Sequence, residues 1–400
     1  MKVLQINAVY GYGSTGRIVL EISECLNTEG IDNKVIACNN LQGCLKICNS
    51  VENKIHALLA RVFGLDSHYS YFSTRKILKV IRKYNPDIIH LHNLHSNYIN
   101  LPKLLKYLAK NDIATVVTLH DCWFYTGKCT HYITVGCDKW QKECGNCPQL
   151  KNDIPSWFFD RTAKQLKEKR DGFNSVPRLA VVGVSDWITN EAKKSLLKNA
   201  KIIKRIYNWI DTETFYPRNV DIREKYNLPK DKFLILFASA GWKIDSNKFN
   251  DVIKLSKQIS NNQHIVLLGK VPNEVDLPKN VTTLGYINNT DELAEINSGC
   301  DVYVHVSRAD TFGKVVAEAL ACGTPAIVYN NTALPELIGD NCGYVVETGD
   351  VDAIKESIDT IQANGKSKYS QSCIEFVKNN FEKEELIKET IMLYKSILNR

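Results

Sequence analysis

Short runs rich in valine and isoleucine alternate with stretches of helical periodicity along most of this 400-residue chain. The runs lack the strict alternation of a half-exposed strand, which is typical of parallel strands covered on both faces. Helices between such strands give doubly wound α/β domains. We expect strands at 3–10, 33–38, 87–92, 114–120, 179–185, 201–208, 233–239, 264–269, 281–286, 300–307 and 324–330, and helices at 16–30, 75–86, 101–112, 247–260, 290–299 and 314–323.

Length and charge favour two domains, because a single core stops growing at about 250–300 residues. Residues 1–205 hold 30 Lys+Arg against 17 Asp+Glu, a net charge of +13, whereas residues 206–400 hold 21 against 27, a net charge of −6. We expect domains at 1–205 and 206–375 and a packed final helix over 376–400. The apolar stripe of that helix consists of Ile387, Ile391, Tyr394 and Leu398.

Three features bear on where the chain works. No apolar run approaches the roughly 20 residues of a membrane-spanning helix. The N-terminus MKVLQINAVYG lacks the apolar core and cleavage site of a signal peptide, so we expect a cytoplasmic protein. Thirteen cysteines, an odd number in a long chain, favour reduced and mostly buried thiols.

Two acids, Asp310 and Glu318, flank the start of a helix expected at 313–322. Thr311, Phe312 and Gly313 lie at its N-terminus, where free N–H groups and the helix dipole favour a phosphate. Carboxylates accept hydrogen bonds from sugar hydroxyls. The turn therefore suits a sugar nucleotide; the alternative is that Asp310 only caps the helix and Glu318 is solvated.

The stretch RADTFGKVVAEALACGTP resembles the signature of retaining family 4 glycosyltransferases, with Asp310 in place of the family's first Glu. The likeness covers roughly residues 1–360. It includes the motifs GYGSTGRI, PDIIHLHNLH, TLHDCWFYTGKC, CDKWQKECGNCPQ, VSDWI, NWIDTETFYP and ALPELIG. Together they are similar to the subgroup that assembles colanic acid, capsule and O-antigen. The resemblance implies the GT-B architecture, two Rossmann-like domains facing a cleft, with the last helix crossing back to the first domain.

The resemblance also implies roles for the residues of the turn. Asp310 contacts hydroxyls of the transferred sugar, and Glu318 holds the donor ribose. The backbone of Phe312 and Gly313, with Thr311 beside it, faces sugar and phosphate. Aspartate is one methylene shorter than glutamate, so the carboxylate of Asp310 reaches less far than that of the family's residue.

A glycine loop follows the first strand, with the spacing Gly11-x-Gly13-x-x-Gly16. Such glycines let backbone approach a ligand, and Ser14 or Thr15 can cap the next helix. Alone, the spacing is a weak dinucleotide signal. No acid ends the second strand, which speaks against a dehydrogenase. The resemblance places Gly13 and Gly16 on the donor side, with Gly16 near the diphosphate.

The leaving diphosphate needs positive charge when catalysis uses no metal. The family supplies an Arg and a Lys after the first strand of the second domain, but the corresponding FASAGWKIDSNKFN has no Arg. Lys243 and Lys248 are the candidates, and Lys248 is favoured. Arg308 and Lys314 flank the signature as further donor-binding candidates; the alternative is that all are solvated.

Histidines end two expected strands of the first domain. His120 closes one of them; on sequence grounds a core histidine is the alternative, whereas the resemblance places it beside the donor sugar as an orienting group. His92, Asn93 and His95 follow the neighbouring strand and are candidates for the acceptor side.

Four cysteines stand in the pattern C-x7-C-x6-C-x2-C within the loop 129–147. Four thiolates suit tetrahedral zinc, and CGNC is a usual half-site. An iron–sulfur cluster and packed free thiols are the alternatives. The four are Cys129, Cys137, Cys144 and Cys147.

The sequence thus predicts a retaining, metal-independent glycosyltransferase that uses a UDP- or GDP-sugar and a saccharide acceptor, in the resemblance a lipid-diphosphate-linked one. The alternatives are a catalytically silent sugar-nucleotide-binding relative and a zinc-containing nucleic-acid-binding protein; we expect no nucleic-acid partner. The basic helices at 75–86 and 101–112 are expected at an anionic membrane surface, on the inner face of the plasma membrane. The alternative is that their apolar stripes face the sheet.

Overall fold

The computed structural model describes residues 1–39 and 41–399, and the chain divides into two compact units. Unit 1 comprises Met1–Ile206 and Ile387–Arg400, and unit 2 comprises Tyr207–Leu386. The first boundary lies one residue beyond the expected one at 205/206. The second differs from the expected 375/376, because a separate helix, α12 (Ser367–Asn380), packs on α10 (Lys314–Ala321) and keeps this part of the chain in unit 2.

Unit 1 is built on a parallel sheet of seven strands among the described residues, in the order β3-β2-β1-β4-β5-β6-β7. The central strands β4, β5 and β6 are buried along their whole length, as their valine- and isoleucine-rich sequences predict. The strands are β1 (Lys2–Ile6), β2 (Asp32–Ala37), β3 (Cys44–Lys46), β4 (Ile88–Leu91), β5 (Ala114–Leu119), β6 (Leu179–Gly183) and β7 (Ile202–Arg205).

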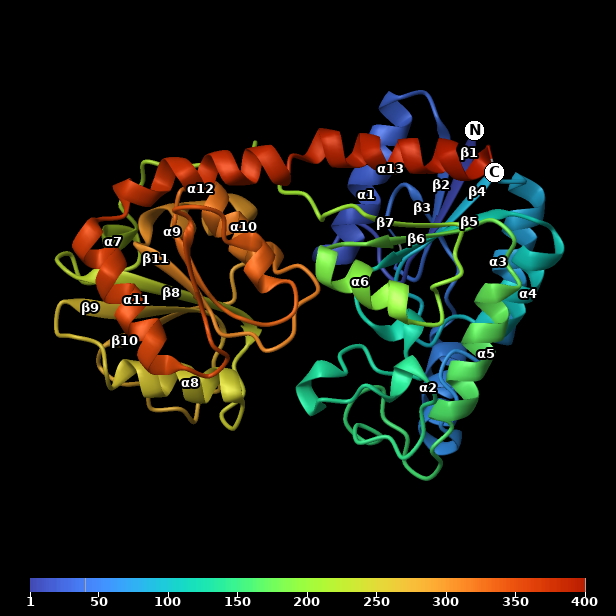
Figure 1. Cartoon of the computed structure of the whole chain (residues 1–400), viewed down its shortest axis with the longest axis horizontal. Coiled ribbons are helices and arrows are strands. Elements are labelled where there is room, and N and C mark those ends of the chain that lie inside the picture. Colours follow the sequence, from blue (N-terminus) through green and yellow to red (C-terminus); the bar gives the residue numbers. More distant parts are fainter. Residues whose placement is uncertain (40, 400) are drawn as a thin grey trace. The chain divides into compact units, whose positions relative to one another are not determined.

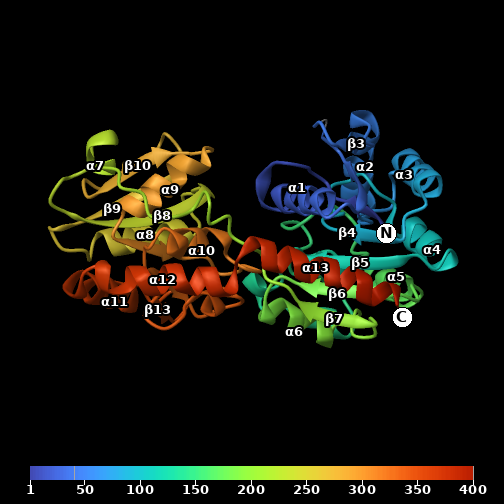
Figure 2. The same ribbon diagram turned by 90° about the horizontal axis from the view of Figure 1, so that it is seen from above.

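Helices cover both faces of this sheet. α1 lies on one face, and α3, α4 and α5 pack side by side on the other (Figures 1 and 2). This is the doubly wound arrangement that the alternation of patterns predicts. The helices are α1 (Gly13–Thr28), α2 (Ser50–Phe63), α3 (Tyr71–Tyr84), α4 (Leu101–Lys110), α5 (Thr162–Asn174) and α6 (Asp186–Lys194).

The last helix, α13 (Lys383–Leu398), packs on the sheet of unit 1 from Ile387 onward. The Tyr394 hydroxyl lies 2.6 Å from His90 Nδ1 on β4, and Glu389 pairs with Lys204 on β7 at 2.8 Å. Of the predicted apolar stripe, Ile387, Ile391 and Tyr394 are buried and Leu398 is half-buried.

Unit 2 repeats the plan with six parallel strands in its described residues, ordered β10-β9-β8-β11-β12-β13. α8 and α11 pack together on one face, and α9, α10 and α12 on the other (Figure 1). The strands are β8 (Phe233–Gly241), β9 (Gln263–Lys270), β10 (Val281–Gly285), β11 (Val302–His305), β12 (Ala326–Tyr329) and β13 (Gly343–Val346). The further helices are α7 (Ile222–Lys225), α8 (Asn247–Ser256), α9 (Thr290–Gly299) and α11 (Val351–Asn364).

Each predicted strand and each of the six helices predicted between strands overlaps an element of the structure, with bounds that differ by a few residues. The sequence did not reveal the short edge strands β3 and β13 or the helices α2, α5, α6, α7, α11 and α12. Within residues 1–39 and 41–399, no helix has the length and apolar character needed to span a membrane.

Candidate functional site

The acidic turn of unit 2 joins the end of β11 to α10. His305 Nε2 lies 2.8 Å from Asp310 Oδ2, and the Tyr303 hydroxyl lies 3.2 Å from His305 Nδ1. The backbone N–H of Asp310 donates to Thr332 Oγ1 at 3.1 Å. The Asp310 carboxylate is therefore held by a buried tyrosine–histidine series that we did not predict. The sequence did contain a signal for this series: Tyr303 and His305 lie two residues apart on β11, and residues with that spacing share one face of a strand.

The electrostatics of the turn keep Asp310 ionised. Burial by itself raises the pKa of Asp310, but His305, the hydrogen bond with Ser307 and the charge of Lys248 outweigh it, and the pKa lies below its ordinary value. Burial raises the pKa of Tyr303 far above 10, and the charges of Asp310 and Glu318 raise it further. Both carboxylates thus raise the pKa of the same buried phenol, so Tyr303 lies within electrostatic range of each acid.

The N-terminus of α10 has no side-chain cap. Gly313 is its N-cap with φ +90°, and the helix starts at Lys314. A Cβ at Gly313 would come within 2.9 Å of the side chains of Leu334 and Leu337, so glycine is required for conformation and for space. Asp310 binds His305 instead of capping α10, which argues against the capping alternative.

The side chain of Phe312 belongs to the core of unit 2. It is 2% exposed and packs edge-on against Phe381 and beside Tyr207. Its neighbour Thr311 is half-buried. Only the backbone at Phe312 is left for a ligand, as the resemblance implies.

The predicted phosphate-binding cations have different surroundings. Lys248 lies half-buried in the first turn of α8 and is close enough to Asp310 to lower its pKa. Lys243 is exposed in the preceding connection, and Lys314 is half-buried. Arg308 forms an ion pair with Asp251 at 3.2 Å, and Asp251 also accepts a hydrogen bond from the Tyr329 hydroxyl. Their roles toward phosphate stay predictions.

In unit 1, the glycine loop closes on itself through a hydrogen bond of 2.9 Å from Gly11 N–H to Gly16 O. α1 begins at Gly13, and its N-cap is Tyr12 without a side-chain hydrogen bond. The predicted caps, Ser14 and Thr15, are therefore wrong, because the helix starts before them. Its first N–H groups carry no side-chain cap.

The loops after β1 and β4 are joined at the carboxyl edge of the sheet. Asn7 Oδ1 accepts from Asn93 N–H at 3.0 Å, and Ala8 N–H donates to Asn93 O at 3.1 Å. The half-buried Asn93 thereby fixes the base of the loop that carries Gly13 and the buried Gly16. Asn7 was not predicted; its place directly after a strand was the available signal.

The predicted histidines also meet at this edge. His92 Nδ1 lies 3.0 Å from His120 Nε2, and His95 Nε2 lies 2.8 Å from Asp121 Oδ2. Burial lowers the pKa of His120 to about 4, so His120 is neutral at pH 7 and suits a hydrogen-bonding role. Burial also opposes charge on His95, but Asp121 outweighs it and raises the pKa of His95.

The four clustered cysteines line one small cavity of unit 1, together with Lys128, Lys139 and Trp140. Cys129 and Cys147 share a hydrogen bond, and Lys139 Nζ donates to the carbonyls of Gly145 and Asn146 within the CGNC turn. Among the described residues, no group of three or more His, Cys, Asp or Glu side chains is arranged to hold a metal ion. The zinc site stays a prediction.

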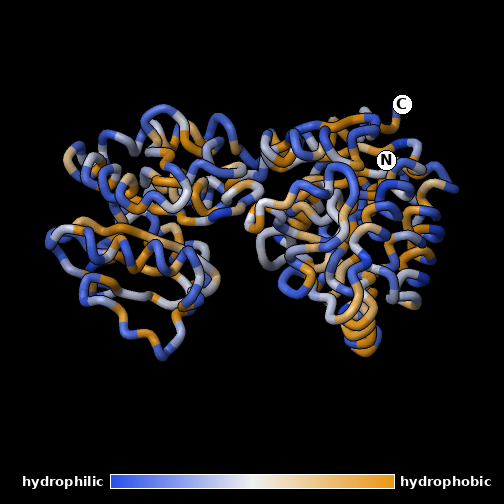
Figure 3. Tube along the Cα trace, turned by 60° about the horizontal axis from the view of Figure 1, so that its bottom comes forward, coloured by the Kyte–Doolittle hydropathy of each residue, from blue (hydrophilic) through white to orange (hydrophobic). Residues whose placement is uncertain are grey.

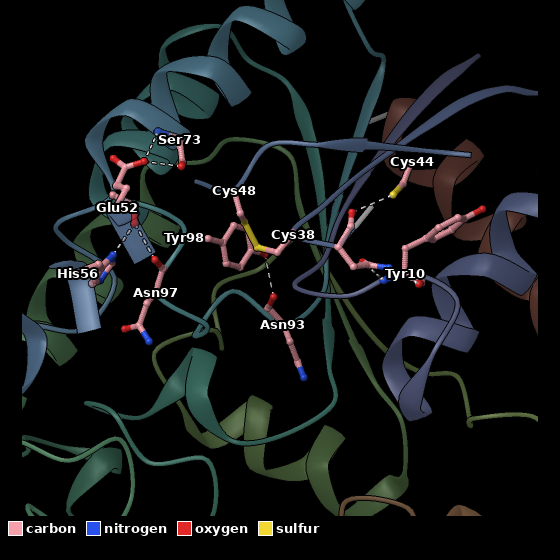
Figure 4. The surroundings of a disulfide bond; sticks show 12 residues. Tyr10, Cys38, Cys44, Cys48, Glu52, His56, Ser73, Asn93, Asn97 and Tyr98 are labelled. Atoms are coloured by element: carbon pink, nitrogen blue, oxygen red, sulfur yellow. Dashed lines mark hydrogen bonds between the residues drawn. A yellow bond between two sulfur atoms is a disulfide. The ribbon is translucent and has the colours of Figure 1, made fainter. Parts of the chain in front are cut away.

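The expectation that all cysteines are reduced is wrong for one pair. In the described part of the chain, Cys38 and Cys48 form the one disulfide, with their Cα atoms 4.7 Å apart (Figure 4). Cys38 follows β2 and Cys48 follows β3, and the pairing of these parallel strands brings the two thiols together. The remaining cysteines are free and buried or half-buried.

Comparison with known proteins adds to this geometry. "Glycosyltransferase Family 4" matches residues 15–214, half of the chain, and "Glycosyl transferases group 1" matches residues 219–380. A putative colanic acid biosynthesis glycosyl transferase of Escherichia coli is 24% identical over 370 residues, 88% of each chain.

Two solved structures show the fold. The sucrose-phosphate synthase of Thermosynechococcus elongatus superposes with a TM-score of 0.72 at 17% identity, over 100% of this chain and 99% of the other. Anabaena Alr3699/HepE, solved in complex with UDP, superposes with a TM-score of 0.70 at 15% identity, over 99% and 100%. The chain therefore has the GT-B fold, with two Rossmann-like domains.

Proposed function

Since this chain belongs to glycosyltransferase family 4, we propose that it is a retaining enzyme that moves a sugar from a UDP- or GDP-linked donor to a saccharide acceptor. The observation that carries the proposal is the ionised Asp310, fixed by His305 beside Glu318 and the uncapped N-terminus of α10. Carboxylates at this place suit sugar hydroxyls, and free helical N–H groups suit the diphosphate.

In the proposed reaction, an acceptor oxygen forms a bond to the anomeric carbon on the face that the diphosphate leaves. The bond from that carbon to the phosphate oxygen breaks, and the departing phosphate oxygen takes the acceptor's proton. The N–H groups of α10 and Lys248 stabilise the charge that develops on the diphosphate, and the neutral His120 orients the sugar. No metal ion is required for these steps.

For the acceptor, we propose a lipid-diphosphate-linked saccharide of a bacterial surface polysaccharide, used at the cytoplasmic face of the membrane. Support comes from the colanic acid relative. A GDP-mannose-dependent phosphatidylinositol dimannoside mannosyltransferase of Mycobacterium tuberculosis is also 26% identical over 159 residues, 38% of this chain and 42% of its own.

A panel of UDP, GDP and their sugars tests the proposal, first by thermal shift and then by release of free nucleoside diphosphate. We expect one nucleotide to stabilise the wild type and its sugar to be hydrolysed slowly without acceptor. Glu318→Gln should keep the fold and nearly abolish turnover, and EDTA should leave wild-type turnover unchanged. Binding without any turnover would instead favour the catalytically silent relative, and a strict Mn²⁺ requirement would contradict the metal-independent reaction.

A further inference from the structure

The exposed face of α2 is apolar, and its buried face is polar. Val51, Ile55, Leu58 and Phe63 are between 45% and 62% exposed, whereas Glu52 and His56 are buried. A surface helix ordinarily turns its apolar stripe to the core. Figure 3 shows α2 as a largely orange coil at the lower edge of unit 1.

Specific contacts fix this reversed orientation. Glu52 accepts hydrogen bonds from the backbone N–H groups of Phe72 at 2.6 Å and Ser73 at 2.9 Å, and so caps α3 (Figure 4). His56 Nδ1 lies 2.6 Å from Ser70 Oγ. Because these polar groups anchor the inner face, turning the apolar face inward would remove the carboxylate that caps the first N–H groups of α3.

Aromatic residues extend the apolar face at both ends of α2. At its C-terminus, Phe63 stacks on Phe159 with ring centroids 6.4 Å apart, and the carbonyl of Arg61 accepts from Trp157 N–H at 2.6 Å. Phe158, between them, is 71% exposed. At the other end, Tyr71 and Phe72 start α3 and are also exposed. The apolar patch thus consists of Val51, Ile55, Leu58, Phe63, Tyr71, Phe72, Trp157, Phe158 and Phe159.

A row of cations borders the apolar patch. Five exposed basic residues of α3 line one surface groove with Phe72, and residues 50–83 hold seven Lys+Arg against two Asp+Glu, both of them buried. The apolar stripes of α3 and α4 face the protein, which is the alternative that the sequence analysis gave. These two helices can therefore offer positive charge to a partner, but they have no apolar face to insert into it. The five cations are Arg75, Lys76, Lys79, Arg82 and Lys83.

We propose that the apolar patch and the cations of α3 dock unit 1 on a bilayer that contains anionic lipid. Aromatic and aliphatic side chains beside Lys and Arg are the composition of interfacial membrane anchors. A second copy of the chain is a poorer occupant, because a symmetric contact would bring the same cations against each other. The choice of a bilayer rests on the proposed lipid-linked acceptor, but the test needs neither donor nor acceptor.

Vesicle flotation of the full-length protein tests the proposal. We expect binding to phosphatidylcholine vesicles with about 30% phosphatidylglycerol at low salt, and weaker binding to pure phosphatidylcholine or at about 500 mM salt, where charges are screened. Ile55→Asn combined with Phe158→Ser, and separately Lys76→Glu with Lys79→Glu, should each reduce the bound fraction at least about tenfold.

The matched controls keep the tests specific. Met392→Ser changes an exposed residue of similar size on α13, at the opposite edge of unit 1 (Figure 1), and Lys193→Glu with Lys198→Glu reverses two exposed charges elsewhere. Both should bind as the wild type, and circular dichroism should show all variants folded. Wild-type binding by the patch variants, or no binding by the wild type at low salt, overturns the proposal. So does concentration-dependent dimerisation that the patch variants abolish. A wild type that transfers sugar but does not bind vesicles at low salt would refute the docking surface and leave the proposed function standing.

Discussion

The hydrogen bond between Asp310 and His305 determines how a substitution of either residue should change turnover. The carboxylate is oriented by a hydrogen bond of 2.8 Å between Asp310 Oδ2 and His305 Nε2. We expect His305→Ala to lower turnover about 10- to 100-fold, the usual worth of a charged hydrogen bond. Asp310→Asn should behave alike, and Asp310→Glu, which restores the family's residue, should keep turnover. Steady-state assays across pH measure the turnover of each variant. An unchanged turnover in His305→Ala would mean that the contact is only structural.

The charge of Lys248 lowers the pKa of Asp310, so this lysine acts electrostatically on the acidic turn. If it binds the diphosphate, Lys248→Ala should weaken the binding of UDP or GDP and leave uridine or guanosine unaffected. Titration calorimetry with each nucleotide and its nucleoside measures the difference in affinity. The control is Lys257→Ala, which changes the lysine that directly follows α8. Equal losses for nucleotide and nucleoside would place Lys248 away from the phosphates.

Buried histidines make stability sensitive to acid. Burial lowers the pKa of His56 from 6.5 to about 4 in the folded chain. Between these values the unfolded chain binds a proton that the folded chain does not, so stability falls as pH falls through this window. His56 alone should cost about 2 kcal/mol between pH 7 and pH 5. Urea unfolding of His56→Gln should show a smaller loss over that interval than the wild type; an equal loss would disprove the assignment.

At the scale of elements, the segment between β5 and α5 stands out. Over residues 120–161 the described chain contains only the short 3-10 helices η1 (Trp123–Tyr125), η2 (Ile133–Val135) and η3 (Lys139–Gln141). Loops of this length without regular structure are uncommon in compact domains, and small irregular segments are often held by a metal. The four cysteines share one cavity there, beside two lysines whose charge would balance a tetrathiolate.

We therefore expect about one zinc ion per chain purified without chelator. Cys144→Ser with Cys147→Ser should lose the metal and make residues 126–161 sensitive to protease. Elemental analysis and limited proteolysis measure both effects. Cys300→Ser, at a buried thiol of unit 2, serves as the control. Metal-free wild type, or equal zinc in both proteins, would leave the cluster as packed thiols.

At the scale of the whole molecule, the end of the chain completes the first core. Ile387, Ile391, Leu393, Tyr394 and Ile397 are buried in unit 1. Removing residues 387–400 would expose apolar surface worth about 7 kcal/mol or more, comparable to the whole stability of a domain. We expect this truncation to unfold unit 1, whereas removal of residues 399–400 alone should have little effect. Thermal unfolding and soluble yield measure it; a native transition in the longer truncation would contradict the packing.

The sequence by itself determined the elements and the chemistry next to them. Valine- and isoleucine-rich runs and helical periodicity are local, so the long strands and the main helices were readable. So were the positions of Asp310, His92 and His120 after strands and of Glu318 within a helix. The edge strands β3 and β13, of three and four residues, carry too little pattern and exist because a neighbouring strand pairs with them.

Only the tertiary structure decided the contacts between distant segments. The Cys38–Cys48 disulfide depends on β2 pairing with β3, and the link of His90 to Tyr394 joins residues 304 positions apart. For the same reason, the sequence did not reveal that the apolar face of α2 is exposed and its polar face buried. Periodicity reveals which residues share a face but not which face is buried, and here Glu52 and His56 found their partners on α3 and just before it. Packing, and not the local sequence, placed the apolar residues of α2 outside.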